Sequence, residues 1–152
     1  MSIRVIEGTV SRILPSVGDL DRPFWTGGRD GRLMIQRCSA CRRWHHPPTA
    51  DGCPECGGEM AFEAASGRGT VFTYTVNHQQ FHPEVPPPYV IAIVELDEQP
   101  DLRLPTNLVD VDPDDLSCGM AVQVLFERSG DVYLPLFQPV SSDDPIESTE
   151  SG

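Results

Sequence analysis

Two cysteine pairs constrain this chain more than any other feature. Cys38 and Cys41 form one C-x-x-C pair, Cys53 and Cys56 form a second, and eleven residues separate them. Two thiolates three positions apart on a tight turn can face a common point, so two such turns supply the four sulfurs of a tetrahedral site. Gly57 after the second pair permits the positive φ that these turns need. The spacing therefore predicts a structural Zn²⁺ held by all four cysteines.

Three alternatives compete with structural zinc. A disulfide framework suits exported proteins, and the start of the chain lacks a secretory pattern. An isolated C-x-x-C redox pair leaves the second pair unexplained, whereas iron in a rubredoxin-type site uses the same four sulfurs and stays open. His45 and His46 are poor candidates for ligands, because four cysteines complete the coordination and leave no position for a catalytic water.

Charge separates the two halves of the chain. The net charge is −12, and all 11 basic residues are arginines. Residues 1–60 are nearly balanced, whereas residues 61–152 hold three arginines against sixteen acids. A nucleic-acid partner requires a basic face, so we expect none here. No apolar run is long enough to cross a membrane, and we expect a cytoplasmic protein.

The second half of the sequence predicts β-structure. Phe72, Tyr74 and Val76 alternate with threonines, which indicates a strand with one buried face. Residues 89–97 are apolar on both faces and should form a central strand; residues 102–111 are weakened by Pro105. Residues 119–128 place Met120, Val122, Val124 and Phe126 on one face, and residues 132–139 complete the set. Five strands with short turns favour a small sandwich or barrel, and a five-stranded Greek-key barrel fits the count.

The predicted organisation has four parts: an N-terminal arm with a short helix (1–31), a zinc ribbon (32–62), an OB-fold barrel (63–140) and a disordered acidic tail (141–152). Asp21 should cap the helix, Pro23 should lie in its first turn, and Gly27 and Gly28 should end it early. Residues 1–17 show no clean period and carry no assignment. Cys118 is expected to be a small buried residue near a turn.

Two segments carry candidate contacts with a nucleotide-bearing substrate or with a partner. Arg37, Arg42, Arg43 and Trp44 gather positive and aromatic character on the ribbon, which suits phosphates or an acidic partner; a solvated surface is the alternative. The segment from Asn77 to Pro88, rich in proline, contributes Asn77, His78, Phe81 and His82 and is longer than a hairpin requires. It lines a groove or meets a partner, unless it is only a covering loop.

Several blocks in this order resemble an acyl-CoA-associated family, long known as domain of unknown function thirty-five, with a rubredoxin-like zinc ribbon before an OB-fold. The blocks are PFWTGGRDGRLMIQRCSAC, HHPPTADGCPECGG, SGRGTVFTYTV, PYVIAIVELDE and GMAVQVLFER, and the match runs from about Pro23 to Pro139. Arg42 stands where the family commonly has glycine. The segment before Phe24 is short for the family's helical hairpin.

The resemblance implies a mainly β protein that acts as a non-catalytic scaffold subunit in a heteromeric complex, such as a heterotetramer, with a thiolase-like enzyme. The partner would carry the chemistry on an acyl-CoA thioester, as thiolase or as an aldolase that cleaves a CoA-linked steroid side chain, and related chains accompany hydratases. The competing functions are an OB-fold nucleic-acid module, in which Phe72, Tyr74 and Phe81 would stack on bases, and a rubredoxin-like iron electron carrier.

Overall fold

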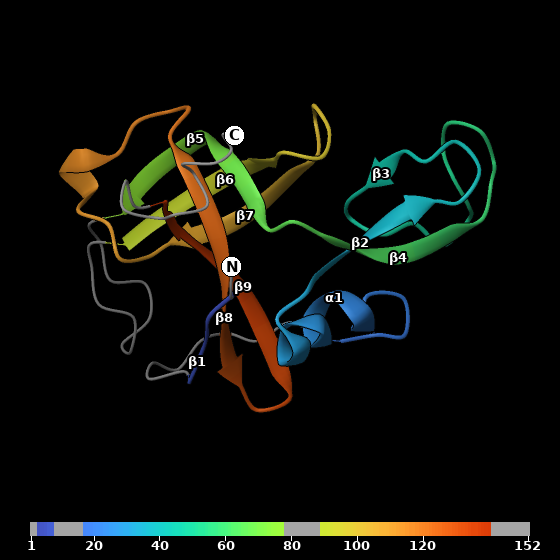
Figure 1. Cartoon of the computed structure of the whole chain (residues 1–152), viewed down its shortest axis with the longest axis horizontal. Coiled ribbons are helices and arrows are strands. Elements are labelled where there is room, and N and C mark those ends of the chain that lie inside the picture. The colour runs from blue at the N-terminus through green and yellow to red at the C-terminus, as the bar shows by residue number, and fades with distance from the viewer. Residues whose placement is uncertain (1–2, 8–16, 78–88, 141–152) are drawn as a thin grey trace, which may run out of the picture.

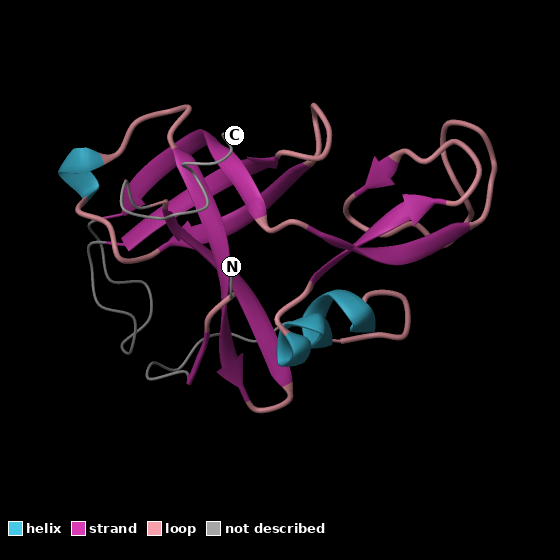
Figure 2. Ribbon diagram, in the orientation of Figure 1, coloured by secondary structure: helices cyan, strands magenta, loops and turns pink. Residues whose placement is uncertain are grey.

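The computed structural model describes residues 3–7, 17–77 and 89–140 and is mainly β (Figure 1). Figure 2 shows two β-rich parts with the helical segment beside them. The elements are β1 (Val5–Glu7), α1 (Arg22–Thr26), η1 (Gly27–Asp30), β2 (Leu33–Cys38), β3 (Trp44–His45), β4 (Met60–Ala65), β5 (Arg68–Asn77), β6 (Tyr89–Leu96), β7 (Arg103–Leu108), η2 (Pro113–Asp115), β8 (Ala121–Ser129) and β9 (Val132–Pro139).

The ribbon is a three-stranded antiparallel sheet in the order β3-β2-β4. Leu33 and Ile35 on β2 have no exposed surface, and both belong to the same hydrophobic core as the barrel residues. The ribbon therefore does not have to fold around the metal alone, because part of its sheet packs into a larger apolar cluster.

The barrel is formed by β5, β6, β7, β9 and β8, in that order of neighbours, and β8 pairs back with β5. All of these pairs are antiparallel except β7–β9, which is parallel and joins Leu108 to Phe137. This closure is that of an OB-fold, so the predicted fold class, including the five-stranded Greek-key barrel, is confirmed. Pro105 lies within β7 opposite Ile93, where it is exposed.

A β-bulge changes the predicted faces of β5. The register with β6 shifts between Val71 and Thr73, so Val71 is buried while Phe72 points outward and is 47% exposed. Tyr74 and Val76 pack against the core as expected. The expectation that Phe72 shares their face was wrong, because one extra residue in a strand reverses the alternation before it.

The predicted inner face of β8 is present, with Val122, Val124 and Phe126 in the core and Met120 packed against it. The opposite face is buried too, since Gln123 and Leu125 have 7% and 0% exposure. On this strand's edge lies β1, which pairs in parallel with Phe126–Arg128. β1 falls in residues 1–17, where no periodic pattern is visible.

The helical segment joins the ribbon to the barrel. As predicted, Asp21 precedes α1 and Pro23 lies in its first turn, but the Asp21 carboxylate accepts hydrogen bonds from Gly18 N and Trp25 Nε1 instead of capping the helix. The α-helix ends at Thr26 with Gly27 as its C-cap, as expected, and the chain continues as the 3₁₀ helix η1. A Cβ on Gly28 would lie 2.6 Å from atoms of Phe126 and Tyr133, so only glycine allows this close approach to the barrel.

The turn between β6 and β7 also contacts the ribbon, and in Figure 1 it lies at the end of the barrel that is nearest the ribbon. Gln99 Oε1 accepts a hydrogen bond from Trp44 N at 2.9 Å, and Gln99 Nε2 donates to Trp44 O at 3.0 Å. In the same turn, Glu98 accepts a hydrogen bond from Ser66 N in the linker between ribbon and barrel. These contacts fix the ribbon relative to the barrel.

Some predictions lie outside the described residues, namely the disordered tail at 141–152 and the contacts at His78, Phe81 and His82. Cys118 is described and lies in the expected turn, but it is exposed, so its predicted burial was wrong. Cys118 lies in the exposed turn at residues 117–119, before the buried residues of β8 (Ala121–Ser129). Within the described ranges, no helix is long and apolar enough to span a membrane.

Candidate metal centre and neighbouring surface

The four predicted cysteine ligands lie together. All four Sγ atoms lie within 4.8 Å of one another, with Cys38 and Cys56 3.5 Å apart and Cys41 and Cys53 3.7 Å apart. A tetrahedral ion with Zn–S bonds of about 2.3 Å places its sulfurs about 3.8 Å apart, whereas a disulfide requires about 2.05 Å. The arrangement fits a tetrahedral four-thiolate metal site, as in a zinc ribbon, and not a pair of disulfides.

Backbone geometry prepares each pair to bind a cation. In the first turn, the N–H groups of Ala40 and Cys41 donate to Cys38 Sγ at 3.3 Å, and in the second turn Glu55 N donates to Cys53 Sγ at 3.3 Å. The hydrogen bond from the Cys41 N–H, followed by that from Ala40, lowers the pKa of the Cys38 thiol to about 6. These hydrogen bonds favour the thiolate of Cys38, which is the form that binds a metal.

The two turns have equivalent backbones but different residues at the fifth position. Arg42 N donates to Cys38 O at 3.0 Å, and Gly57 N donates to Cys53 O at 2.8 Å. Arg42 and Gly57 have φ values of 68° and 78°, so an arginine holds the left-handed conformation that glycine supplies in the second turn. The departure from glycine noted in the sequence therefore places backbone strain at Arg42.

Gly58 completes the second turn for a steric reason. A Cβ there would lie 2.8 Å from both Cys38 Sγ and Ala40 Cβ. Any side chain at this position would displace the first cysteine of the cluster. The glycine after the last pair was visible in the sequence, but this reason for it was not.

His45 contributes to the centre in a way that the sequence analysis missed. Its Nε2 lies 3.5 Å from Cys53 Sγ, at the outside of the cluster. This distance places His45 to hydrogen-bond a cysteine sulfur from outside the four-sulfur cluster. A second contact that the sequence did not indicate is made by Gln36, which is buried. Its Oε1 accepts a hydrogen bond from Thr49 N at 2.8 Å, and its Nε2 donates one to Thr49 O at 3.0 Å.

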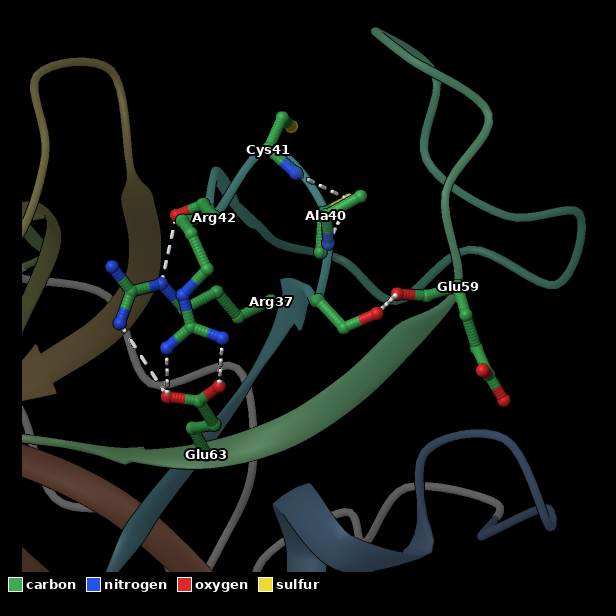
Figure 3. Close-up of polar contacts among 8 residues, drawn as sticks. Arg37, Ala40, Cys41, Arg42, Glu59 and Glu63 are labelled. Atoms are coloured by element: carbon green, nitrogen blue, oxygen red, sulfur yellow. Dashed lines mark hydrogen bonds and ion pairs between the residues drawn. The ribbon is translucent and has the colours of Figure 1, made fainter.

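Arg37 and Arg42 converge on one carboxylate instead of lying free (Figure 3). Arg42 forms contacts of 3.0 and 3.2 Å with the two Glu63 oxygens, and Arg37 Nη1 lies 3.4 Å from Glu63. Arg37 Nε also donates to Arg42 O at 2.7 Å, which ties it to the first cysteine turn. Glu63 therefore neutralises part of the positive charge that the sequence placed on the ribbon.

The other candidate contact residues differ in how exposed they are. Trp44 is only 7% exposed, lies in the core, and has Arg37 stacked over its ring at 4.6 Å. Arg43 is exposed and makes no ion pair within the described residues. Asn77 is half-buried at the end of β5. The structure thus joins Arg37, Arg42 and Trp44 in one cluster of contacting residues that does not include the Arg43 side chain.

Comparisons with known proteins agree with this architecture. Residues 25–63 match the family described as the ChsH2 rubredoxin-like zinc ribbon domain, and residues 62–127 match the ChsH2 C-terminal OB-fold domain. In structure, the chain is similar to the "Ltp2-ChsH2(DUF35) aldolase", with a TM-score of 0.74 and 38% identity. That match covers 83% of this chain and 98% of the other chain.

Three relatives extend the comparison. A "DUF35 domain-containing scaffold protein" of Methanocaldococcus jannaschii is 38% identical over 63% of this chain and 68% of its own. A "Probable enoyl-CoA hydratase alpha subunit" of Thermomonospora curvata is 42% identical over 78% of this chain. A "3-oxo-4,17-pregnadiene-20-carboxyl-CoA hydratase alpha subunit" of Mycobacterium tuberculosis is 34% identical over 76% of this chain. The matches span only 37% and 36% of these two hydratase subunits. The chain belongs to the ChsH2/DUF35 family, in which a rubredoxin-like zinc ribbon precedes an OB-fold.

Proposed function

We propose that this chain is a non-catalytic scaffold subunit of a thiolase-like acyl-CoA enzyme, best described as an aldolase that cleaves a CoA-linked steroid side chain. The observation that carries the proposal is the similarity to the Ltp2-ChsH2 aldolase, because the match covers 98% of that chain at 38% identity. The steroid portion is supported by the M. tuberculosis relative, whose name contains a pregnadiene-carboxyl-CoA. The scaffold role is supported by the DUF35 relative named as a scaffold protein.

The metal centre supports a structural and not a chemical role. Zn²⁺ held by Cys38, Cys41, Cys53 and Cys56 would have all four positions filled by sulfur, which leaves none for water or substrate. The ion would contribute folding free energy, about 10–16 kcal/mol in small zinc modules. The residues of the chain would then hold the ribbon in place and present surfaces to another protein.

We assign the candidate CoA contact on the ribbon to Arg43. Arg37 and Arg42 share Glu63, whereas the Arg43 guanidinium is available for a phosphate. Arg43→Ala should therefore weaken acyl-CoA binding by the complex, and Arg42→Ala should act mainly through ribbon stability. If the complex with Arg43→Ala bound acyl-CoA as tightly as the unchanged complex, the proposal that Arg43 contacts a CoA phosphate would be refuted.

A hydratase subunit is the second candidate function, favoured by the 42% identity to the T. curvata relative. The two candidates differ in the reaction of the assembled complex, which is release of a carbonyl fragment in the aldolase and addition of water in the hydratase. A nucleic-acid module is disfavoured by the acidic barrel, and an iron carrier by the match to a zinc ribbon.

The experiment is co-expression with the thiolase-like proteins encoded beside the chain and, separately, with the neighbouring hydratase subunits. We expect a stable heteromer with a thiolase-like chain, one zinc per copy of this subunit, and retro-aldol cleavage of a steroid acyl-CoA that requires both proteins. Turnover by the isolated chain, or assembly only with a hydratase subunit, would contradict the proposal. Cys118→Ser, outside the metal cluster, is the matched control for Cys53→Ser in assembly and zinc content.

A further inference from the structure

The outer face of β5, β6 and β7 carries an apolar strip, which consists of Phe72, Ile91, Ile93 and Pro105. Phe72 is 47% exposed and Ile91 is 42% exposed. Ile93 on β6 pairs with Thr73 on β5 and with Pro105 on β7. The outward side chains of the three strands therefore form one continuous surface. Four apolar side chains side by side on an outer sheet face indicate an interaction site.

The β-bulge places the aromatic ring of this strip. Because the register shifts between Val71 and Thr73, Phe72 and Thr73 both face outward while Val71 and Tyr74 face the core. In a regular strand only every second residue would lie on this face, and Phe72 would point toward the core with Tyr74. Bulges commonly redirect side chains at functional positions.

Arg103 lies over the exposed ring of Phe72. Its Cζ is 3.7 Å from the centroid of Phe72, and its guanidinium contacts Glu95 at 3.5 Å and Asp101 at 3.2 Å. Two carboxylates therefore position the guanidinium of Arg103 over the Phe72 ring. Aromatic and arginine side chains dominate binding energy at protein interfaces, and fixing them beforehand lowers the entropic cost of association.

The charge at one end of the strip indicates what it binds. Glu95, Asp97, Glu98 and Asp101 gather in and beside the β6–β7 turn, where Arg103 and Arg68 supply fewer positive charges. This excess of carboxylates repels phosphates, so nucleic acid and the nucleotide part of CoA are unsuitable occupants of a face that many OB-folds use for oligonucleotides. It complements a protein surface that has an apolar centre and basic side chains at one edge.

We propose that the strip is the face by which this chain docks on its thiolase-like partner, with arginine or lysine side chains of that partner opposite the acidic β6–β7 turn. The identity of the partner rests on the proposed function; the location and chemistry of the surface rest on the strip itself. A second copy of this chain and a single-stranded nucleic acid are the other occupants that the test distinguishes.

The test compares affinities for the purified thiolase-like chain. The double substitution Phe72→Ala and Ile91→Thr removes the two large exposed apolar side chains of the strip, while it keeps a β-branched residue at position 91. Val5→Thr is the matched control, because Val5 is 42% exposed on β1, outside the strip. Circular dichroism and zinc content establish that both variants are folded.

We expect the double variant to bind the partner at least about tenfold more weakly than the control. Asp101→Asn should lower the association rate and reduce its dependence on salt. Full affinity of the folded double variant would overturn the docking surface while the scaffold function stands. Failure of the unchanged chain to bind any thiolase-like protein would overturn both. Loss of self-association in sedimentation, or of oligonucleotide binding, with unchanged partner affinity would assign the strip to those occupants instead.

Discussion

Acidification should weaken the contact between α1 and the ribbon through His46. This side chain packs on Phe24 with ring centroids 4.9 Å apart, and Phe24 is 4% exposed in the shared core. Burial lowers the pKa of His46 from 6.5 to about 4. The folded protein therefore keeps His46 neutral at a pH at which the unfolded chain already holds a proton.

The sign and size of the effect follow from this difference in pKa. Between pH 6.5 and about 4, His46 binds more protons in the unfolded state than in the folded state. Its contribution to the free energy of unfolding is therefore fully present above pH 6.5 and decreases as the pH falls. Each pKa unit corresponds to about 1.4 kcal/mol, which gives a loss of at most about 3 kcal/mol by pH 4. Because the side chain is half-buried, we expect the measured loss to be smaller.

The assay is denaturant unfolding of the zinc-loaded protein at several pH values between 7 and 4.5, followed by tryptophan fluorescence. His46→Phe keeps an aromatic ring against Phe24 but cannot be protonated. Protonation of the cysteine ligands affects both proteins alike, so the difference between them isolates His46. Parallel stability curves across this pH range would refute the reasoning, whereas a difference that grows toward low pH would support it.

Three further predictions concern the ribbon and its link to the barrel. Cys53→Ser should abolish zinc binding and unfold the tip of the ribbon while the barrel persists, as measured by metal analysis and amide NMR signals; a zinc-free variant with an ordered ribbon would contradict a structural metal. Arg42→Gly should be tested in a Glu63→Gln background, so that the ion pair between these residues is absent from both proteins compared. It should raise the free energy of unfolding by about 1 kcal/mol, because glycine adopts the left-handed conformation of this residue without strain. An unchanged melting temperature would argue against strain at that turn. Gln99→Leu should cost about 1–3 kcal/mol and speed hydrogen exchange at the Trp44 amide, because two backbone groups lose their partner; slow exchange in that variant would show that the contact is dispensable.

The amino-acid sequence determined the four-cysteine cluster and the barrel class. The spacing of Cys38, Cys41, Cys53 and Cys56 was sufficient because each pair forms its own turn, and local backbone geometry brings its sulfurs together. The five barrel strands were visible because alternation of apolar residues and short apolar runs are local properties of the chain. The glycines near the second pair were visible for the same reason.

Only the tertiary structure decided which surfaces remain free. Glu63 is 21 residues from Arg42, and Gln99 is 55 residues from Trp44, so no local pattern shows that the ribbon arginines are neutralised or that the β6–β7 turn holds the ribbon. The outward position of Phe72 depends on the register between two strands, which the alternation within one strand cannot specify. Local spacing thus fixes the ligands of an ion, whereas the pairing of distant segments fixes which charges and apolar side chains are left for a partner.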